Sequence, residues 1–175
     1  MKAALIVIDM QEVFFRLLEN YLYDKDRLVG QINRLIGQAR AKGMPVIFVQ
    51  HTEREDERDE FYEGGDDWQI HHGMDREESD PVFQKTKWDS FYQTGLEAYL
   101  RENEIDELVF AGAQTEFCID TTIRAAYSLG YQRNRLFAGT HSTLDSRVLP
   151  AEQIIRHHEN VWKGRFVNIL DGDLE

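Results

Sequence analysis

Apolar runs and amphipathic stretches alternate over the first fifty residues of the chain. Residues 3–8 form a continuous apolar run, which is typical of a strand that is buried on both faces. Residues 25–42 carry apolar side chains at helical spacing, and Gly43 follows as a C-terminal stop. A second apolar run covers residues 45–49. The order strand, helix, strand predicts a βαβ unit and therefore a parallel sheet.

Residues 51–80, called the 51–80 excursion below, have a different character. They are rich in Asp, Glu, Gly and His and show no sustained periodicity. A loop of this length in a compact domain is usually functional or disordered. Because it contains Trp68 and Ile70, we expect part of the excursion to pack against the domain.

The alternation of helices and strands resumes after the excursion. Thr94 and Glu97 have the spacing of a capping box, which predicts a helix that extends to about residue 103. Residues 107–111 form a third apolar run and predict a buried strand. Thr115 is expected to cap the next helix, which the pattern places over residues 115–129.

The last part of the chain completes the pattern. Residues 135–138 predict a weaker strand, Pro150 fits the first turn of a helix that ends near residue 163, and residues 166–169 predict a last strand. No internal repeat or linker interrupts residues 1–175, so we expect a single domain. The predicted fold class is α/β, with a doubly wound parallel sheet that binds ligands at the C-terminal ends of its strands.

Composition and charge narrow the functional classes. The chain has 42% hydrophobic and 30% charged residues, as an ordinary globular protein does. Its formal net charge of -12 argues against nucleic acid and against anionic lipid as partners. The apolar start is too short for a signal peptide or a membrane span, and the one cysteine cannot form an internal disulfide. We therefore expect a cytoplasmic protein that acts on a small molecule.

Two residues stand where α/β folds place their chemistry. Asp9 directly follows the first apolar run, at a sheet edge where burial would suit it to proton transfer. A turn or capping aspartate gives the same pattern, and taken alone that interpretation is favoured. Cys118 lies in the first turn of a predicted helix, whose N–H groups and dipole stabilise a thiolate and a tetrahedral oxyanion. A lone cysteine is, however, more often a small buried hydrophobe than a nucleophile.

Other candidates remain open on residue type and spacing alone. Lys85 or Lys87 would lower the pKa of a nearby thiol, but spacing does not choose between them. Trp68, Trp88 and Phe91 could line an apolar pocket, and core or lid packing explains each of them equally well.

The histidines do not predict a metal site. His51 ends the second predicted strand, His71 and His72 lie in the excursion, and His157 and His158 lie in the last predicted helix. No pair has the His-x-x-x-His spacing of a helical metal site, and adjacent histidines on a helix point to different faces.

Three segments in this order resemble the isochorismatase-like cysteine hydrolases, a superfamily that includes nicotinamidases and carbamoyl-sarcosine amidases. Residues 5–11 are similar to the opening strand of the family and place its catalytic aspartate at Asp9. Residues 85–91 are similar to its lysine segment and select Lys85 instead of Lys87. The most specific segment is 112–122, which places the nucleophile at Cys118. The resemblance extends from residue 4 to about residue 162.

The resemblance implies a fold and a mechanism. The fold would be a Rossmann-like three-layer α/β/α sandwich with five or six parallel strands. A cis peptide bond would join Ala113 to Gln114, and the N–H groups of Gln114 and Cys118 would form an oxyanion hole. Asp9 would accept the thiol proton, Cys118 would form a thioester, Lys85 would stabilise negative charge, and an amine would leave.

The resemblance also implies partners and a substrate class. The reaction would cleave a C–N bond of a small carboxamide or related acyl compound, in a homo-oligomer that is a dimer or a tetramer. The residues expected to contact the substrate are Gln11, Phe14, Trp68, Trp88 and Phe91.

The sequence departs from nicotinamidases at one functional position. Residues 49–53 lack the first aspartate of the nicotinamidase metal set, so we expect no metal and no other cofactor. Two alternatives to amide hydrolysis stay open. One is cleavage of an ether or ester by Asp9 acid–base chemistry, as in isochorismatases. The other is a non-catalytic binding or scaffold protein on the same fold.

Overall fold

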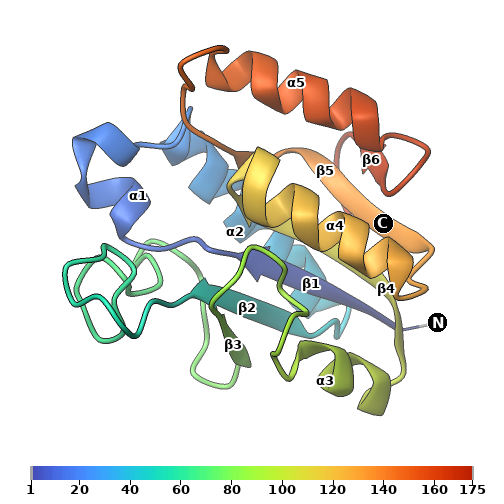
Figure 1. Ribbon diagram of the computed structural model, residues 1–175. Coiled ribbons are helices and arrows are strands. Elements are labelled where there is room, and N and C mark those ends of the chain that lie inside the picture. The colour runs from blue at the N-terminus through green and yellow to red at the C-terminus, as the bar shows by residue number, and fades with distance from the viewer. Residues whose placement is uncertain (1, 175) are drawn as a thin grey trace.

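Six parallel strands form one sheet at the centre of the molecule (Figure 1). The computed structural model describes residues 2–174. The strand order across the sheet is β3-β2-β1-β4-β5-β6, which is the doubly wound arrangement that the sequence predicts. The strands are β1 (Lys2–Ile8), β2 (Val46–His51), β3 (Val82–Lys85), β4 (Ile105–Ala113), β5 (Arg133–Ser142) and β6 (Asn168–Leu170).

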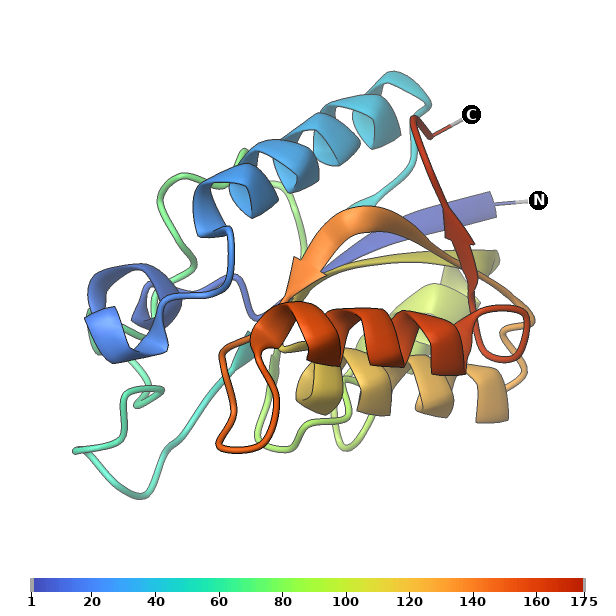
Figure 2. The same ribbon diagram turned by 90° about the horizontal axis from the view of Figure 1, so that it is seen from above.

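Helices cover both faces of the sheet and complete three layers. Figure 2 shows α2 on one side of the sheet and α4 and α5 on the other. Over residues 2–174, no helix combines the length and the apolar character that crossing a bilayer requires. The helical segments are α1 (Val13–Arg16), the 3₁₀ turn η1 (Leu18–Asn20), α2 (Lys25–Ala41), α3 (Leu96–Glu102), the π-helical turn η2 (Thr115–Ile119), α4 (Asp120–Ser128) and α5 (Ala151–Trp162).

The apolar run of β1 supplies both halves of the hydrophobic core. Leu5 and Val7 pack in the cluster that includes the apolar stripe of α2, whereas Ile6 and Ile8 pack in the cluster on the opposite face. Successive strand residues point to opposite faces, so a strand between two helical layers needs apolar residues at every position. The predicted burial is therefore confirmed for residues 4–8, whereas Ala3 is partly exposed.

The order of the chain through the sheet reverses between β1 and β4, which pair in parallel with Ile8 opposite Gly112. A Cβ atom on Gly112 would lie 2.0 Å from the carbonyl oxygen of Ile8, and the residue has a φ of +126°. Only glycine fits this close approach of two backbones. The crevice at such a reversal point is where doubly wound folds place their ligands.

Three local details differ from the sequence predictions. Strand β3 was not predicted, because a four-residue edge strand that is only half-buried leaves little hydrophobic pattern. Thr94 and Glu97 do not form a capping box: helix α3 begins at Leu96, and Thr94 Oγ1 accepts the N–H of Leu96 at 3.3 Å. The carboxylate of Glu97 instead accepts a hydrogen bond from Arg101.

Thr115 does not cap an α-helix either. Its hydroxyl oxygen lies 2.9 Å from Nδ1 of His141, and it opens the π-helical turn η2 before α4 begins at Asp120. The excursion packs down as expected, because Ile70 forms an antiparallel bridge with Gln11.

Candidate active site

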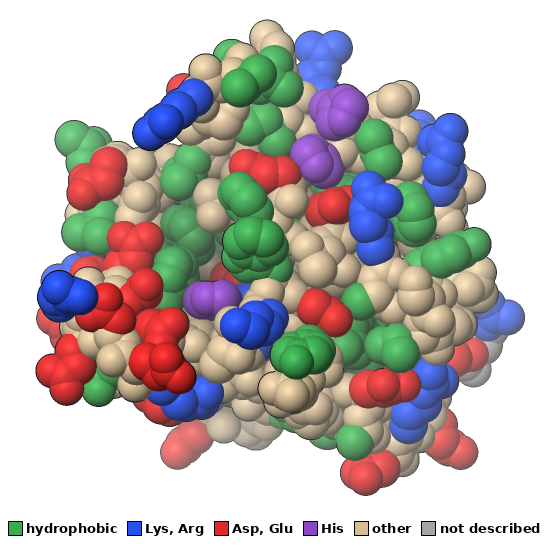
Figure 3. All heavy atoms as spheres, in the orientation of Figure 1, with side chains coloured by type: hydrophobic (Ala, Val, Ile, Leu, Met, Phe, Trp, Pro, Cys, Tyr) green, Lys and Arg blue, Asp and Glu red, His purple; other side chains and the backbone are tan. Residues whose placement is uncertain are grey.

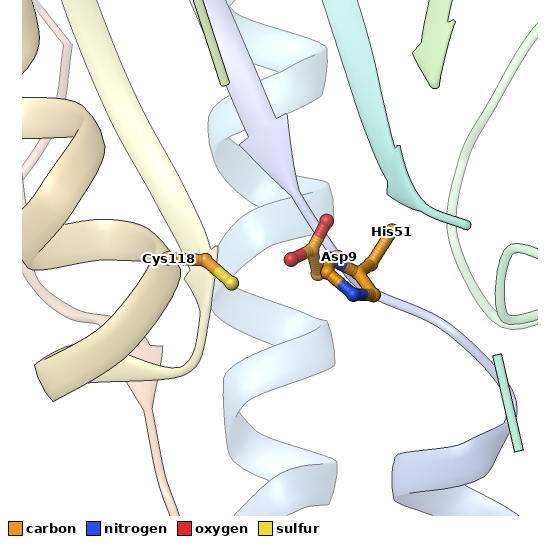
Figure 4. A group of neighbouring side chains, drawn as sticks. All are labelled: Asp9, His51 and Cys118. Atoms are coloured by element: carbon orange, nitrogen blue, oxygen red, sulfur yellow. The ribbon is translucent and has the colours of Figure 1, made fainter. Parts of the chain in front are cut away.

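Four side chains meet at the carboxyl edge of the sheet, each supplied by a different strand. Asp9 directly follows β1, His51 ends β2, Lys85 ends β3, and Cys118 lies in η2 just after β4. Because the strands are parallel and adjacent, their ends lie side by side even though the residues are far apart in sequence. Figure 4 shows Asp9, His51 and Cys118 drawn together at this edge.

Lys85 is the centre of the group. Its Nζ lies 2.7 Å from Oδ2 of Asp9, 3.0 Å from Nδ1 of His51 and 3.2 Å from Sγ of Cys118. An ammonium group has three N–H donors, and here each has an acceptor. The sequence left the choice between two lysines to the family resemblance, and the structure places Lys85 in the group while Lys87 is exposed.

Asp9 and Lys85 form a buried ion pair, with 2% and 1% of each residue exposed. The backbone of Asp9 is left-handed, with a φ of 51°, a conformation that aspartate and asparagine tolerate better than most residues. Its second oxygen, Oδ1, is buried and has no hydrogen-bond partner among residues 2–174. This oxygen is therefore free to accept a proton.

The surroundings of Cys118 favour the neutral thiol over the thiolate. Burial is the largest effect that raises the pKa of the Cys118 thiol well above its ordinary value, and the negative charge of Asp9 is the second. Lys85 acts in the opposite direction. A thiolate beside the Asp9 carboxylate would place two negative charges against the single positive charge of Lys85.

Lys85 stays protonated in this environment. Burial opposes its charge, but the charge of Asp9 and the hydrogen bonds to Asp9 and Cys118 raise the pKa of Lys85 above its ordinary value. With a neutral thiol, the Asp9–Lys85 pair has no net charge. Moving the thiol proton to Asp9 keeps that balance, because it creates a thiolate–lysine pair and a neutral carboxylic acid.

His51 is neutral and has a defined tautomer. Burial is the largest effect that lowers the pKa of His51 below its ordinary value, and the positive charge of Lys85 is the second. Because Lys85 donates to Nδ1, the proton of the neutral ring belongs on Nε2. The His51 backbone is held by Gln11, whose side-chain amide accepts the His51 N–H at 2.8 Å and donates to the His51 carbonyl at 2.9 Å.

Two neighbouring cavities reach the group, and both are lined by His51 and Trp88. The inner chamber has a volume of about 240 Å³, and the outer chamber about 560 Å³. The inner chamber is lined by Asp9, Phe14, His51, Phe61, Trp88, Gln114, Phe117 and Cys118. The outer chamber is lined by His51, Thr86, Lys87, Trp88, Asp89, Tyr92 and Thr121.

Only two of the five expected substrate contacts line these chambers, namely Phe14 and Trp88. Gln11 is fully buried, and its side-chain amide forms hydrogen bonds with the backbone of His51 and Trp68. Trp68 donates its indole N–H to Thr52 at 3.0 Å. Phe91 packs in the core, with its ring centroid 6.1 Å from that of Tyr131. These three side chains face their own neighbours and not the cavities.

Sequence reasoning missed two aromatic walls of the inner chamber. Phe61 lies in the excursion and contacts both Phe14 and His51 edge to face, at centroid distances of 5.8 and 5.0 Å. Phe117 precedes the cysteine and packs against Trp88 at 5.3 Å. The sequence gives only a weak indication that Phe61 lines a cavity, because the residue lies in an aperiodic acidic segment. Phe117 directly precedes Cys118, and this position could have suggested that Phe117 lines the site.

The peptide bond between Ala113 and Gln114 is cis, as the family resemblance predicts. Gln114 and Cys118 both line the inner chamber. Ligand atoms of Asp9, His51 and Cys118 lie within 4.8 Å of one another, a spacing that a metal ion could use. However, the Lys85 ammonium already donates to all three side chains, so a positive charge occupies that place.

Comparisons with known proteins identify the family of the chain. A family model described as the isochorismatase domain matches residues 3–133. A solved structure described as an isochorismatase family protein is 40% identical, covers 96% of this chain and 97% of its own chain, and has a TM-score of 0.88. Streptothricin hydrolase of Streptomyces noursei is 30% identical over 147 residues, which cover 84% of this chain and 52% of that protein. Ureidoacrylate amidohydrolase RutB of Pseudomonas syringae pv. syringae is 28% identical, with 80% and 71% covered.

Proposed function

The chain belongs to the isochorismatase family and is a hydrolase of the cysteine hydrolase kind, and from this premise we propose that it cleaves the C–N bond of a small carboxamide through a thioester on Cys118. The observation that carries the proposal is the contact of Lys85 with both Asp9 and Cys118, at 2.7 and 3.2 Å. A charge-neutral group of this composition can transfer the thiol proton without leaving an unbalanced charge in a buried site.

The first half of the reaction forms the thioester. The Cys118 proton passes to the unpartnered Oδ1 of Asp9 while Sγ bonds to the carbonyl carbon of the substrate. The oxyanion is stabilised by the N–H groups of Gln114, just before η2, and of Cys118, within η2. The C–N bond then breaks, the departing amine takes the proton from Asp9, and an acyl group remains on sulfur.

The second half consumes water. Asp9 accepts a proton from a water molecule, the oxygen attacks the thioester carbon, and the C–S bond breaks. Sulfur recovers its proton from Asp9, and a carboxylic acid is released. Throughout both halves, Lys85 remains protonated and offsets whichever of the two partners, Asp9 or Cys118, carries the negative charge.

The chambers favour a small, apolar and uncharged acyl group. Four aromatic side chains line the inner chamber, and Lys85 beside them is already paired with Asp9, while Lys87 lines the outer chamber. Acidic side chains gather on the adjacent flank, over the segment between β2 and β3 (Figures 1 and 3). An anionic substrate would meet repulsion there, whereas a neutral amide would not. Two of the relatives are named streptothricin hydrolase and ureidoacrylate amidohydrolase, and both names describe hydrolases.

The test is to trap the intermediate. Purified protein is incubated with a panel of small neutral carboxamides and quenched in acid, and intact mass and product release are measured. We expect an acyl adduct on Cys118, no turnover by Cys118→Ala, and unchanged turnover by Lys42→Met, a control that replaces an exposed lysine at the end of α2.

Other outcomes point to the alternatives. Full turnover by Cys118→Ala would contradict the thioester route. Cleavage of ether or ester substrates without an adduct would favour Asp9 acid–base chemistry. A chain that binds compounds from the panel but turns over none of them would favour a binding protein.

A further inference from the structure

A second cluster of ionisable side chains lies outside the catalytic group and lines neither chamber. Glu12 comes just before α1, and His71 and His72 lie near the end of the 51–80 excursion. Backbone hydrogen bonds fix the two segments side by side, because the Glu12 N–H donates to Gln69 and the His71 N–H donates to Met10, both at 2.8 Å. The three side chains are therefore presented by backbone that is held at several points.

The three side chains converge on one place. Oε1 of Glu12 lies 3.2 Å from Nδ1 of His71 and 2.6 Å from Nδ1 of His72. One ligand atom from each residue lies within 4.8 Å of the others. The Glu12 side chain is 9% exposed, whereas the His72 side chain is 85% exposed. The cluster therefore has a buried anchor and an open side through which an ion can enter.

An independent observation points to a missing positive charge. The two oxygens of the Glu12 carboxylate differ in their hydrogen-bond partners. Oε1 faces the two imidazole nitrogens and accepts the His72 N–H. Oε2 is buried and has no hydrogen-bond partner among residues 2–174. A buried carboxylate oxygen without a partner is costly. A cation that is held by Oε1 and also approached by Oε2 would reduce that cost.

The ring of His71 is held in an orientation that suits a ligand. It stacks on Phe15, with ring centroids 3.7 Å apart and an angle of 8° between the planes. Gly73 is also close to this ring, because a Cβ atom on Gly73 would lie 2.7 Å from Nε2 of His71. The backbone of Gly73 therefore covers Nε2, and Nδ1 is the nitrogen that faces Glu12 and His72. Support of this kind around a ligand is what fixes metal sites in proteins.

We propose that Glu12, His71 and His72 form a structural binding site for a divalent transition metal ion, of which Zn²⁺ is the best match. Two imidazole nitrogens and one carboxylate oxygen are typical Zn²⁺ ligands, whereas Mg²⁺ and Ca²⁺ prefer oxygen. On binding, each neutral imidazole gives Nδ1 to the metal and carries its proton on Nε2. Water completes the coordination on the exposed side. The ion would clamp the end of the excursion to the start of α1.

The test measures binding directly and does not depend on activity. Chelator-treated, full-length protein is titrated with ZnCl₂ by calorimetry, and its melting temperature is recorded with ZnCl₂ or MgCl₂. We expect one Zn²⁺ per chain, a rise in melting temperature of about 5 °C at saturating Zn²⁺, and no comparable effect of Mg²⁺. Glu12→Gln and His71→Gln should lose the binding. His72→Ala should weaken it at least tenfold and, because His72 is exposed, should fold normally.

Matched controls separate this site from others. His157→Ala removes a histidine from α5 and should bind Zn²⁺ as the unaltered protein does. Cys118→Ala should also bind it normally, because the catalytic group is not the proposed site. The proposal is overturned if Zn²⁺ does not bind in a one-to-one ratio. It is equally overturned if His72→Ala binds normally, or if Cys118→Ala abolishes binding.

Discussion

Replacing Asp9 by asparagine is expected to make the Cys118 thiol more reactive while it abolishes turnover. The carboxylate raises the pKa of the thiol through its charge, so its removal favours the thiolate, which is the reactive form. Lys85 remains to pair with that thiolate at 3.2 Å. Asparagine keeps the shape of the side chain and tolerates the left-handed backbone at this position. The variant would, however, lack the base that the proposed reaction needs.

The magnitude follows from the distances in the site. A carboxylate oxygen of Asp9 and Sγ of Cys118 lie within 4.8 Å. At an effective dielectric constant of about 20, two charges at that separation interact by about 3.5 kcal/mol. Because about 1.4 kcal/mol changes an equilibrium tenfold, the thiolate population should rise roughly 300-fold. Replacing Lys85 by methionine should change it in the opposite direction, because Lys85 is the positive charge that favours the thiolate.

The assay is alkylation by iodoacetamide, a small neutral reagent, followed by intact mass between pH 6 and 9. Cys118 is the only cysteine, so the label reports on one site. Asp89→Asn is the control for Asp9→Asn, because it removes a carboxylate from the wall of the outer chamber. Lys87→Met is the control for Lys85→Met, because it removes a nearby exposed charge.

The opposite signs of the two effects make the prediction easy to refute. We expect alkylation of Asp9→Asn to be faster by about two orders of magnitude at pH 7, and alkylation of Lys85→Met to be slower than that of the unaltered protein. If Asp9→Asn changed the rate less than threefold, or if both variants changed it in the same direction, the electrostatic account of the site would be wrong.

Three further predictions concern pH and stability. Because the pKa of His51 is lowered from its ordinary value of 6.5 and Lys85 needs its neutral Nδ1, kcat/KM should decline only once the pH is below 6.5, and His51→Gln should remove that decline. Thermal melting should show Lys85→Met destabilised by about 3–5 kcal/mol, because a buried carboxylate loses its partner, while Lys87→Met stays within about 0.5 kcal/mol. Gly112→Ala should lose about 3 kcal/mol or more because its Cβ meets the β1 backbone, whereas Gly37→Ala, in open space within α2, should gain about 0.5–1 kcal/mol in denaturant unfolding.

The sequence determined the architecture because burial leaves a periodic trace. The continuous apolar run in β1 and the helical stripe of α2 predicted a parallel sheet covered on both faces, and both predictions are confirmed. Strand β3 left no such trace, because it is short, half-buried and at the edge of the sheet. The caps expected at Thr94 and Thr115 are absent. The Thr94 hydroxyl donates to the Ser90 carbonyl and the Thr115 hydroxyl contacts His141, and sequence spacing reveals neither partner.

The residues of the proposed catalytic group could also be named from the sequence, since the resemblance to the family motifs points to Asp9, Lys85 and Cys118 by position. The resting state of the thiol could not, because its pKa depends on burial and on a carboxylate 109 positions away in the chain, a distance that only folding closes. The same holds for His51 as the third acceptor of Lys85, and for Glu12 beside His71 and His72. Sequence patterns record which residues are buried, whereas the energy of a charge depends on which other charges the tertiary structure brings within a few ångströms.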